Sequence, residues 1–371
     1  MDWFGNRKEE SFEYRRVDRS DWSEGAAWPQ VTGGTIELSA LSDLKASGSL
    51  SFEGEAMPDE RGVVRVYYSF ADQHGERGEF ALATLLFSCA EPSYDGAAVA
   101  GTLECSSVLR ILQSKRYRFP FTVAAGTQAV QLAIGLVEGC GLRVNSPEAT
   151  AYEVREDYTF DAGKTYLEIV NGLLDMAGFS ACWPDAYGVV QMERRSEPGE
   201  RPVAMEFADD ERSIMHPEVV PRKDFDVCNV FAASYANDRE SLWASTSVTD
   251  PSAWFSTANM DEATDFRRAS VLEGETVEAR LESLKEETRQ RAVDNMAKVE
   301  HVKMAHPWVP IAPGDAVSVD YRAAGIGWGG CVTSMRIDLS PECRCDTELR
   351  RFVRSELKTE TEGGILWHDE T

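Results

Sequence analysis

Alternating apolar and polar positions dominate the first hundred residues. Residues 33–54 fit two strands around a polar turn, and residues 62–70 and 78–90 are rich in β-branched and aromatic side chains. Strands joined by turns at this spacing are typical of an antiparallel sandwich or barrel. We therefore expect residues 1–105 to form the N-terminal part of a first β-barrel.

The spacing becomes helical in residues 106–210. Residues 126–141 carry apolar side chains on one face and end in Gly-Cys-Gly, and residues 164–177 repeat apolar positions at intervals of three and four. Residues 179–194 predict a hairpin with its turn near Pro184-Asp185. The segment as a whole is expected to be an inserted α/β portion.

Strand patterns return after residue 210. Residues 211–260, with the clearest strand at 227–237, are expected to complete the first barrel. Residues 261–355 contain a long helix at 276–300 followed by more strands, which predicts a second barrel. The polar, acidic residues 356–371 are expected to form an arm. The fold class is therefore α+β and β-rich, and 371 residues suffice for two or three domains.

Spacing also predicts details of the C-terminal third. Glu287–Arg291 and Asp294–Lys298 stand four apart on the long helix and predict ion pairs on a solvated face. In residues 331–339 the alternation places Val332 on the face opposite Met335.

The chain is strongly acidic, with a formal net charge of −25. Such a surface repels nucleic acid at long range, so sequence-specific nucleic-acid binding is disfavoured. The first residues lack the apolar core of a signal peptide and no apolar run is long enough to cross a bilayer. We expect synthesis in a cytoplasm, no stable membrane insertion, and reduced cysteines.

Gly163-Lys164-Thr165 at the start of a helix looks like part of a phosphate-binding loop. That loop needs an earlier glycine five positions before Gly163, where this chain has Tyr158. We expect an ordinary helix entry instead, with Asp161 or Gly163 as the cap and Lys164 solvated.

No other pattern predicts catalysis, a cofactor or a metal. The histidines lack metal-ligand spacing, and His301 and His306 should point to opposite faces of a strand as ordinary surface or strand-end residues. Cys343 and Cys345 form no zinc pattern. The glycine-rich residues 325–330 predict a flexible hairpin loop. Most of the nine tryptophans are expected to be core or subunit-interface anchors. We predict no catalytic, cofactor-binding or metal-binding residue and no enzymatic activity, with a carboxylate-based glycoside hydrolase as the alternative of a different class.

Residues 158–193 resemble a signature of phage tail hub proteins, in which an amphipathic helix precedes a hairpin with a D-x-x-G turn. Residues 35–54, 208–234 and 306–321 are similar to barrel strands of such hubs, so the resemblance covers about residues 10–355. The matching positions of the signature are Phe160, Gly163, Thr165, Leu167, Ile169, Val170, Asn171, Leu173, Leu174, Ala177, Gly178, Phe179, Asp185 and Gly188.

The resemblance implies a tail-tip or baseplate hub of the late-control type found in contractile and long-tailed phages. Such hubs have two tube-like β-barrels around an α/β insert and assemble as homotrimers that adapt a six-fold tail tube to a three-fold tip. It further implies a tail tube or distal tail protein above, a spike, fibre or tip protein below, and a tape measure protein and genome DNA in the channel. The expected location is the virion, after assembly in the host cytoplasm.

Two alternatives remain within this class. One is a hub-like spike protein of a contractile injection system. The other is a tail-tip protein with a domain that binds or cleaves the cell wall, which we expect to be a separate polypeptide because only a short arm follows residue 355.

Overall fold

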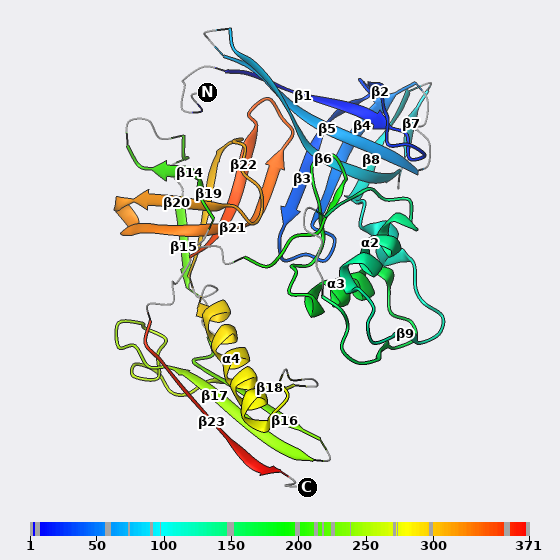
Figure 1. The fold of residues 1–371 in the computed structure, drawn as a ribbon. Coiled ribbons are helices and arrows are strands. Elements are labelled where there is room, and N and C mark those ends of the chain that lie inside the picture. Colours follow the sequence, from blue (N-terminus) through cyan, green and yellow to red (C-terminus); the bar gives the residue numbers. More distant parts are fainter. Residues whose placement is uncertain are drawn as a thin grey trace.

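Figure 1 shows the computed structural model of the chain, in which a strand-rich part carries a helical insert on one side and a separate helix-and-sheet unit below. The structure describes residues 3, 8–55, 61–72, 75–89, 92–96, 98–146, 152–196, 201–210, 214–216, 219–223, 227–237, 239–269, 272, 274–296, 300–351 and 357–368.

Strands from both ends of the chain join in one 14-stranded sheet, ordered β15-β19-β22-β21-β3-β4-β8-β6-β5-β1-β2 with β14, β20 and β7 on side branches. Its N-terminal strands are β1 (Lys8–Val17), β2 (Glu24–Ala27), β3 (Val31–Ser39), β4 (Ala46–Gly54), β5 (Arg61–Asp72), β6 (Arg77–Cys89), β7 (Ser93–Asp95) and β8 (Ala98–Ser107). Its later strands are β14 (Val203–Ala208), β15 (Val219–Lys223), β19 (Glu300–Pro307), β20 (Ala316–Tyr321), β21 (Ile326–Asp338) and β22 (Arg344–Arg351).

The two groups of strands meet where β3 pairs with β21 antiparallel, with Ile36 opposite Ile337. Both side chains are at most 1% exposed and belong to one apolar core shared by the two groups. In the same core the rings of Tyr68 and Trp308, from opposite ends of the chain, lie 4.5 Å apart. The chain is therefore β-rich α+β, as expected, and among the described strands the sheet path is open, ending at β15 and β2.

The insert is a small α/β unit in which helix α2 packs against helix α3, and its apolar core also includes Val17, Trp22 and Val63 from the side of the main sheet. Its hairpin forms as predicted, with Pro184 opposite Val190. The elements of the insert are α1 (Arg110–Ser114), β9 (Phe121–Val123), α2 (Ala129–Glu138), β10 (Val144–Asn145), β11 (Tyr158–Phe160), α3 (Tyr166–Met176), β12 (Trp183–Pro184) and β13 (Val190–Gln191).

A second sheet of four strands carries helix α4 on one face (Figure 1). Its strand order is β18-β16-β17-β23. A buried hydroxyl contact joins the helix to the sheet, because the Oγ1 atoms of Thr246 and Thr288 lie 2.9 Å apart. The elements are β16 (Val230–Ala236), β17 (Glu240–Val248), β18 (Thr264–Arg268), α4 (Val277–Met296) and β23 (Thr359–His368).

This unit corrects two expectations. β16 and β17, expected to complete the first barrel, pair with β18 and β23 instead, and the expected C-terminal arm contains β23. The sequence of β23 is too polar to be predicted as a strand. Its inward residue Thr361 makes a polar contact, 3.0 Å from the buried Thr246 hydroxyl, and Glu360 and Glu362 are exposed. The domain division at residues 105, 210, 260 and 355 stays a prediction.

The charged face of α4 also differs from expectation. Arg291 binds Asp265 on β18 at 2.6 Å, and Glu287 lies 3.5 Å from Arg267 of the same strand. The predicted Glu287–Arg291 pair is therefore replaced by contacts that fix β18 beside the helix. Lys298 of the other predicted pair lies outside the described residues.

Two expectations for β21 were wrong. A register shift between Val332 and Ser334 places Val332 in the core, fully buried, although simple alternation put it opposite Met335. The glycine-rich stretch is strand rather than loop from Ile326 onward. Gly330 suits that strand because a Cβ there would meet the Arg350 carbonyl oxygen at 2.9 Å.

Candidate functional site

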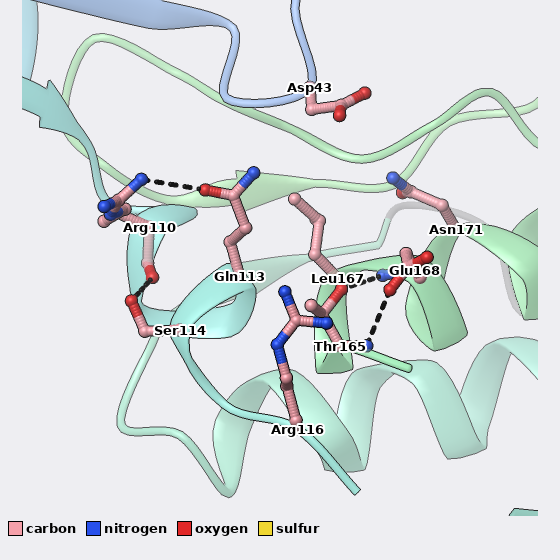
Figure 2. Close-up of a pocket in the computed structure, with 9 residues that line it drawn as sticks. All are labelled: Asp43, Arg110, Gln113, Ser114, Arg116, Thr165, Leu167, Glu168 and Asn171. Atoms are coloured by element: carbon pink, nitrogen blue, oxygen red, sulfur yellow. Dashed lines mark hydrogen bonds between the residues drawn. The ribbon is translucent and has the colours of Figure 1, made fainter. Parts of the chain in front are cut away.

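The entry to helix α3 is closed by a capping box. Thr165 is the N-cap residue, and its hydroxyl accepts a hydrogen bond from the Glu168 N–H at 3.0 Å. The Glu168 carboxylate in turn accepts from the Thr165 N–H at 2.7 Å, as Figure 2 shows. Thr165, not Asp161 or Gly163, therefore caps the helix.

This arrangement leaves no phosphate loop at Lys164. The Lys164 ammonium donates to Glu168 at 2.8 Å, so the lysine is paired across one helical turn rather than free for an anion. Hydrogen bonds from Lys164 and from the Thr165 N–H lower the pKa of Glu168 to about 2. A carboxylate of the chain itself thus holds the position that a phosphate would take.

The histidines of β19 are buried rather than exposed, which corrects the sequence expectation. His306 is 0% exposed; Nδ1 lies 2.7 Å from the Pro307 carbonyl oxygen and Nε2 lies 2.8 Å from the Thr347 hydroxyl. Burial lowers the pKa of His306 to about 4, so the ring is neutral at pH 7. His301 is also buried and lies 3.2 Å from a Glu348 carboxylate oxygen.

Cys343 and Cys345 are buried in the main core, where burial raises the pKa of each thiol to about 12. Within the described ranges, no group of three His, Cys, Asp or Glu side chains is placed to hold a metal ion. Trp308 lies in the same core, as expected of a core anchor.

A buried polar site joins the insert to the main sheet. Arg65 stands in the middle of β5, with its side chain 4% exposed. Its Nε atom donates to the Thr84 hydroxyl at 2.7 Å, one terminal nitrogen binds the Glu24 carboxylate, and the other donates to the Tyr187 carbonyl oxygen at 3.0 Å. The guanidinium therefore links two strands of the sheet to the hairpin turn of the insert.

Further hydrogen bonds complete this joint. Thr84 donates to the Ala186 carbonyl oxygen at 2.8 Å, and Arg143 donates to the Tyr187 carbonyl oxygen at 2.7 Å. Trp22 donates through its indole nitrogen to the Gly141 carbonyl oxygen at 3.0 Å. Three backbone carbonyls of the insert are thus satisfied by side chains, which fixes the insert in one orientation.

The turn between β12 and β13 carries the D-x-x-G pattern of the hub signature, and it forms the insert side of this joint. The Asp185 carboxylate accepts from the N–H groups of Tyr187 and Val189, each at 2.9 Å. Gly188 has φ +75° and lies so close to the sheet that a Cβ would meet the Thr84 side chain at 3.2 Å. Asp185 shapes the turn and Gly188 lets it approach the sheet.

Sequence reasoning missed Arg65, although a signal was present. It is the single charged residue in the apolar run from Val63 to Phe70. A buried arginine needs acceptors, and the paired strands supply only some of them, so a partner from another unit was implied.

No family model and no curated protein matches the chain in sequence. Solved structures do match it in fold. A tail protein from Neisseria meningitidis MC58 is 12% identical, aligned over 92% of this chain and 96% of its own, with a TM-score of 0.66. The 43 kDa tail protein of prophage MuSo2 from Shewanella oneidensis is 14% identical, over 91% and 98% of the two chains, with a TM-score of 0.63. A Francisella PdpA–VgrG complex chain is 5% identical, over 95% of this chain and 59% of that one, with a TM-score of 0.56.

The chain therefore has the fold of phage tail proteins, which is the class that the sequence resemblance implies. At identities of 5–14%, the similarity shows a shared fold alone. In the part of the chain that the structure describes, no helix has the length and apolar character needed to cross a membrane.

Proposed function

We propose that the chain is a structural hub of a phage tail tip or baseplate. The observation that carries this proposal is the fold likeness to two phage tail proteins over more than nine tenths of each chain. Because the alignments cover more than nine tenths of both chains, they support a common role for the chain as a whole rather than for one part of it. The specific insert joint supports a rigid framework role.

In the proposed assembly, three copies form a ring that adapts a six-fold tail tube to a three-fold tip or spike. Each copy contributes two tube-like β-barrels, formed from strands of the 14-stranded sheet. Three copies carry a formal charge of about −75, three times −25. Part of that charge lines the channel, so that DNA passes without sticking to the wall.

The partners follow from this position. A tail tube or distal tail protein lies above the ring, a spike, fibre or tip protein lies below, and a tape measure protein occupies the lumen before ejection. The role is non-enzymatic, and its place is the tail tip of the virion after assembly in the host cytoplasm.

A hub-like spike component of a contractile injection system is the second candidate. The alignment to a chain of the Francisella PdpA–VgrG complex favours it, because 95% of this chain is covered.

Mass measurement in solution tests the hub proposal. Light scattering after size exclusion should give a trimer, and a co-expressed tail tube protein should co-elute with it. A stable monomer that hydrolyses a polysaccharide would overturn the proposal, and a basic or neutral channel wall in an imaged particle would remove the acidic-channel part.

A further inference from the structure

A cluster of cations stands on this otherwise acidic chain. No Asp or Glu occurs between Glu104 and Glu138, the longest such stretch of the sequence. The stretch carries four cations within α1 and the turn after it, here called the basic cluster: Arg110, Lys115, Arg116 and Arg118. All four side chains are exposed.

None of the four makes an ion pair with a carboxylate of the described residues. Arg110 donates to the Gln113 amide oxygen at 3.1 Å, and Arg116 donates to the Gly163 carbonyl oxygen at 2.8 Å. The Lys115 ammonium lies 5.9 Å from the centre of the Tyr166 ring. These neutral partners orient the side chains and leave their positive charge uncompensated.

Arg110 and Arg116 line a groove of about 580 Å³ between α1 and the start of α3, shown in Figure 2. The groove has two carboxylates, of which Glu168 is paired with Lys164 and Asp43 lies on the turn between β3 and β4. Beside the cluster, Phe119 is 77% exposed, a larger exposed fraction than that of any other large apolar side chain described. Free cations next to an exposed aromatic ring are typical of a contact surface.

We propose that the basic cluster binds the acidic surface of a second copy of this chain, an inference that rests on the proposed trimer. Copies that each carry −25 repel one another, so a stable contact must place positive charge of one copy against negative charge of the next. A three-fold ring needs such a contact between two different patches, because its interfaces are heterologous. The same net charge disfavours DNA as the occupant.

Charge reversal with a matched control tests the contact. The double variant Arg110→Glu, Arg118→Glu should raise the trimer dissociation constant about 100-fold or more, measured by sedimentation at several concentrations. The control Arg61→Glu, Arg77→Glu makes the same change in net charge on exposed arginines of β5 and β6 and should leave the trimer intact. Circular dichroism should show that both variants are folded.

The outcomes separate this inference from the hub proposal. A wild-type trimer whose cluster variant associates as tightly overturns the inference and leaves the hub standing. If both double variants dissociate equally, net charge rather than the cluster is responsible, and the inference fails. A wild-type monomer overturns the trimer and the contact together.

Carbodiimide cross-linking provides a second test, because Lys115 is the one primary amine of the cluster. In a mixture of isotope-labelled and unlabelled wild-type subunits, Lys115 should be joined to an Asp or Glu of the other copy. Lys115→Arg keeps the charge and should abolish that product. Products within one copy alone would contradict the contact.

Discussion

The Arg65 guanidinium, buried in the main sheet, donates to the Tyr187 carbonyl oxygen of the insert at 3.0 Å. One side chain thereby connects the main sheet to the insert, whose apolar core also takes in Val17, Trp22 and Val63 from the sheet side. The guanidinium also lies 5.0 Å from the Tyr187 ring centre, which adds a cation–π contact. The orientation of the insert therefore depends on these polar contacts together with the apolar contacts of Val17, Trp22 and Val63.

Replacing Arg65 should loosen the insert. Arg65→Met fills a similar volume but removes the buried cation that binds Glu24 and leaves the Tyr187 carbonyl without that donor, and we expect the free energy of unfolding to fall by about 2–3 kcal/mol. Hydrogen exchange at Tyr187 and Val189 should accelerate. Arg61→Met, at an exposed site of the same strand, is the control and should change stability by less than about 0.5 kcal/mol. Unchanged exchange in Arg65→Met would show that the joint does not hold the turn.

Gly188 allows a matched pair of glycine substitutions. Gly188→Ala and Gly126→Ala both place a side chain at positive φ, +75° and +80°, so both should lose about 1 kcal/mol. Only at Gly188 does the new Cβ press on Thr84, and there we expect about 1 kcal/mol more. Denaturant titration measures the difference. Equal losses of stability in the two variants would mean that the turn moves away from Thr84 at no cost in free energy.

Local patterns predicted much of this fold. The helices at 126–141 and 164–177, the hairpin near Pro184 and the strands of the first hundred residues all appear, because their apolar residues follow the periods of the elements. β23 escaped prediction because its inward positions include Thr361 and Gly363, opposite Thr246 and Ala244, and these residue types carry little hydrophobic signal. The Arg65 joint escaped prediction because its acceptors in the insert are backbone carbonyls, which any sequence could supply.

The capping box separates the roles of two adjacent residues. Thr165→Ala removes the acceptor for the Glu168 N–H and should cost about 1 kcal/mol. Lys164→Ala removes an exposed ion pair that is screened by solvent, so we expect little change in stability and an unchanged assembly. Thermal melting and size exclusion measure both. A nucleotide affinity that disappears in Lys164→Ala would contradict the interpretation of this helix entry.

Leu173 tests whether the core of the insert folds as a unit. The side chain is fully buried on α3, so Leu173→Asp places an unpaired charge among apolar groups and should prevent folding of the insert. Gln131→Asp, exposed on α2, is the control. Proteolysis should then cut within residues 106–196 of the Leu173 variant alone. A protease-resistant insert in Leu173→Asp would refute this prediction.

His306 should make the main sheet sensitive to acid. Burial lowers its pKa from 6.5 in the unfolded chain to about 4 in the folded one, so the unfolded chain binds more protons between these values. The stabilisation is complete above about pH 6.5 and is lost as the pH falls toward 4, by about 3 kcal/mol in all. His306→Gln should reduce the dependence of unfolding free energy on pH in this window, while His216→Gln, at an exposed site whose charge adds only a lesser part of the pKa lowering of His306, should retain most of it. If the unfolding free energy of the wild type and of His306→Gln changed equally with pH, carboxylates alone would account for the loss of stability in acid.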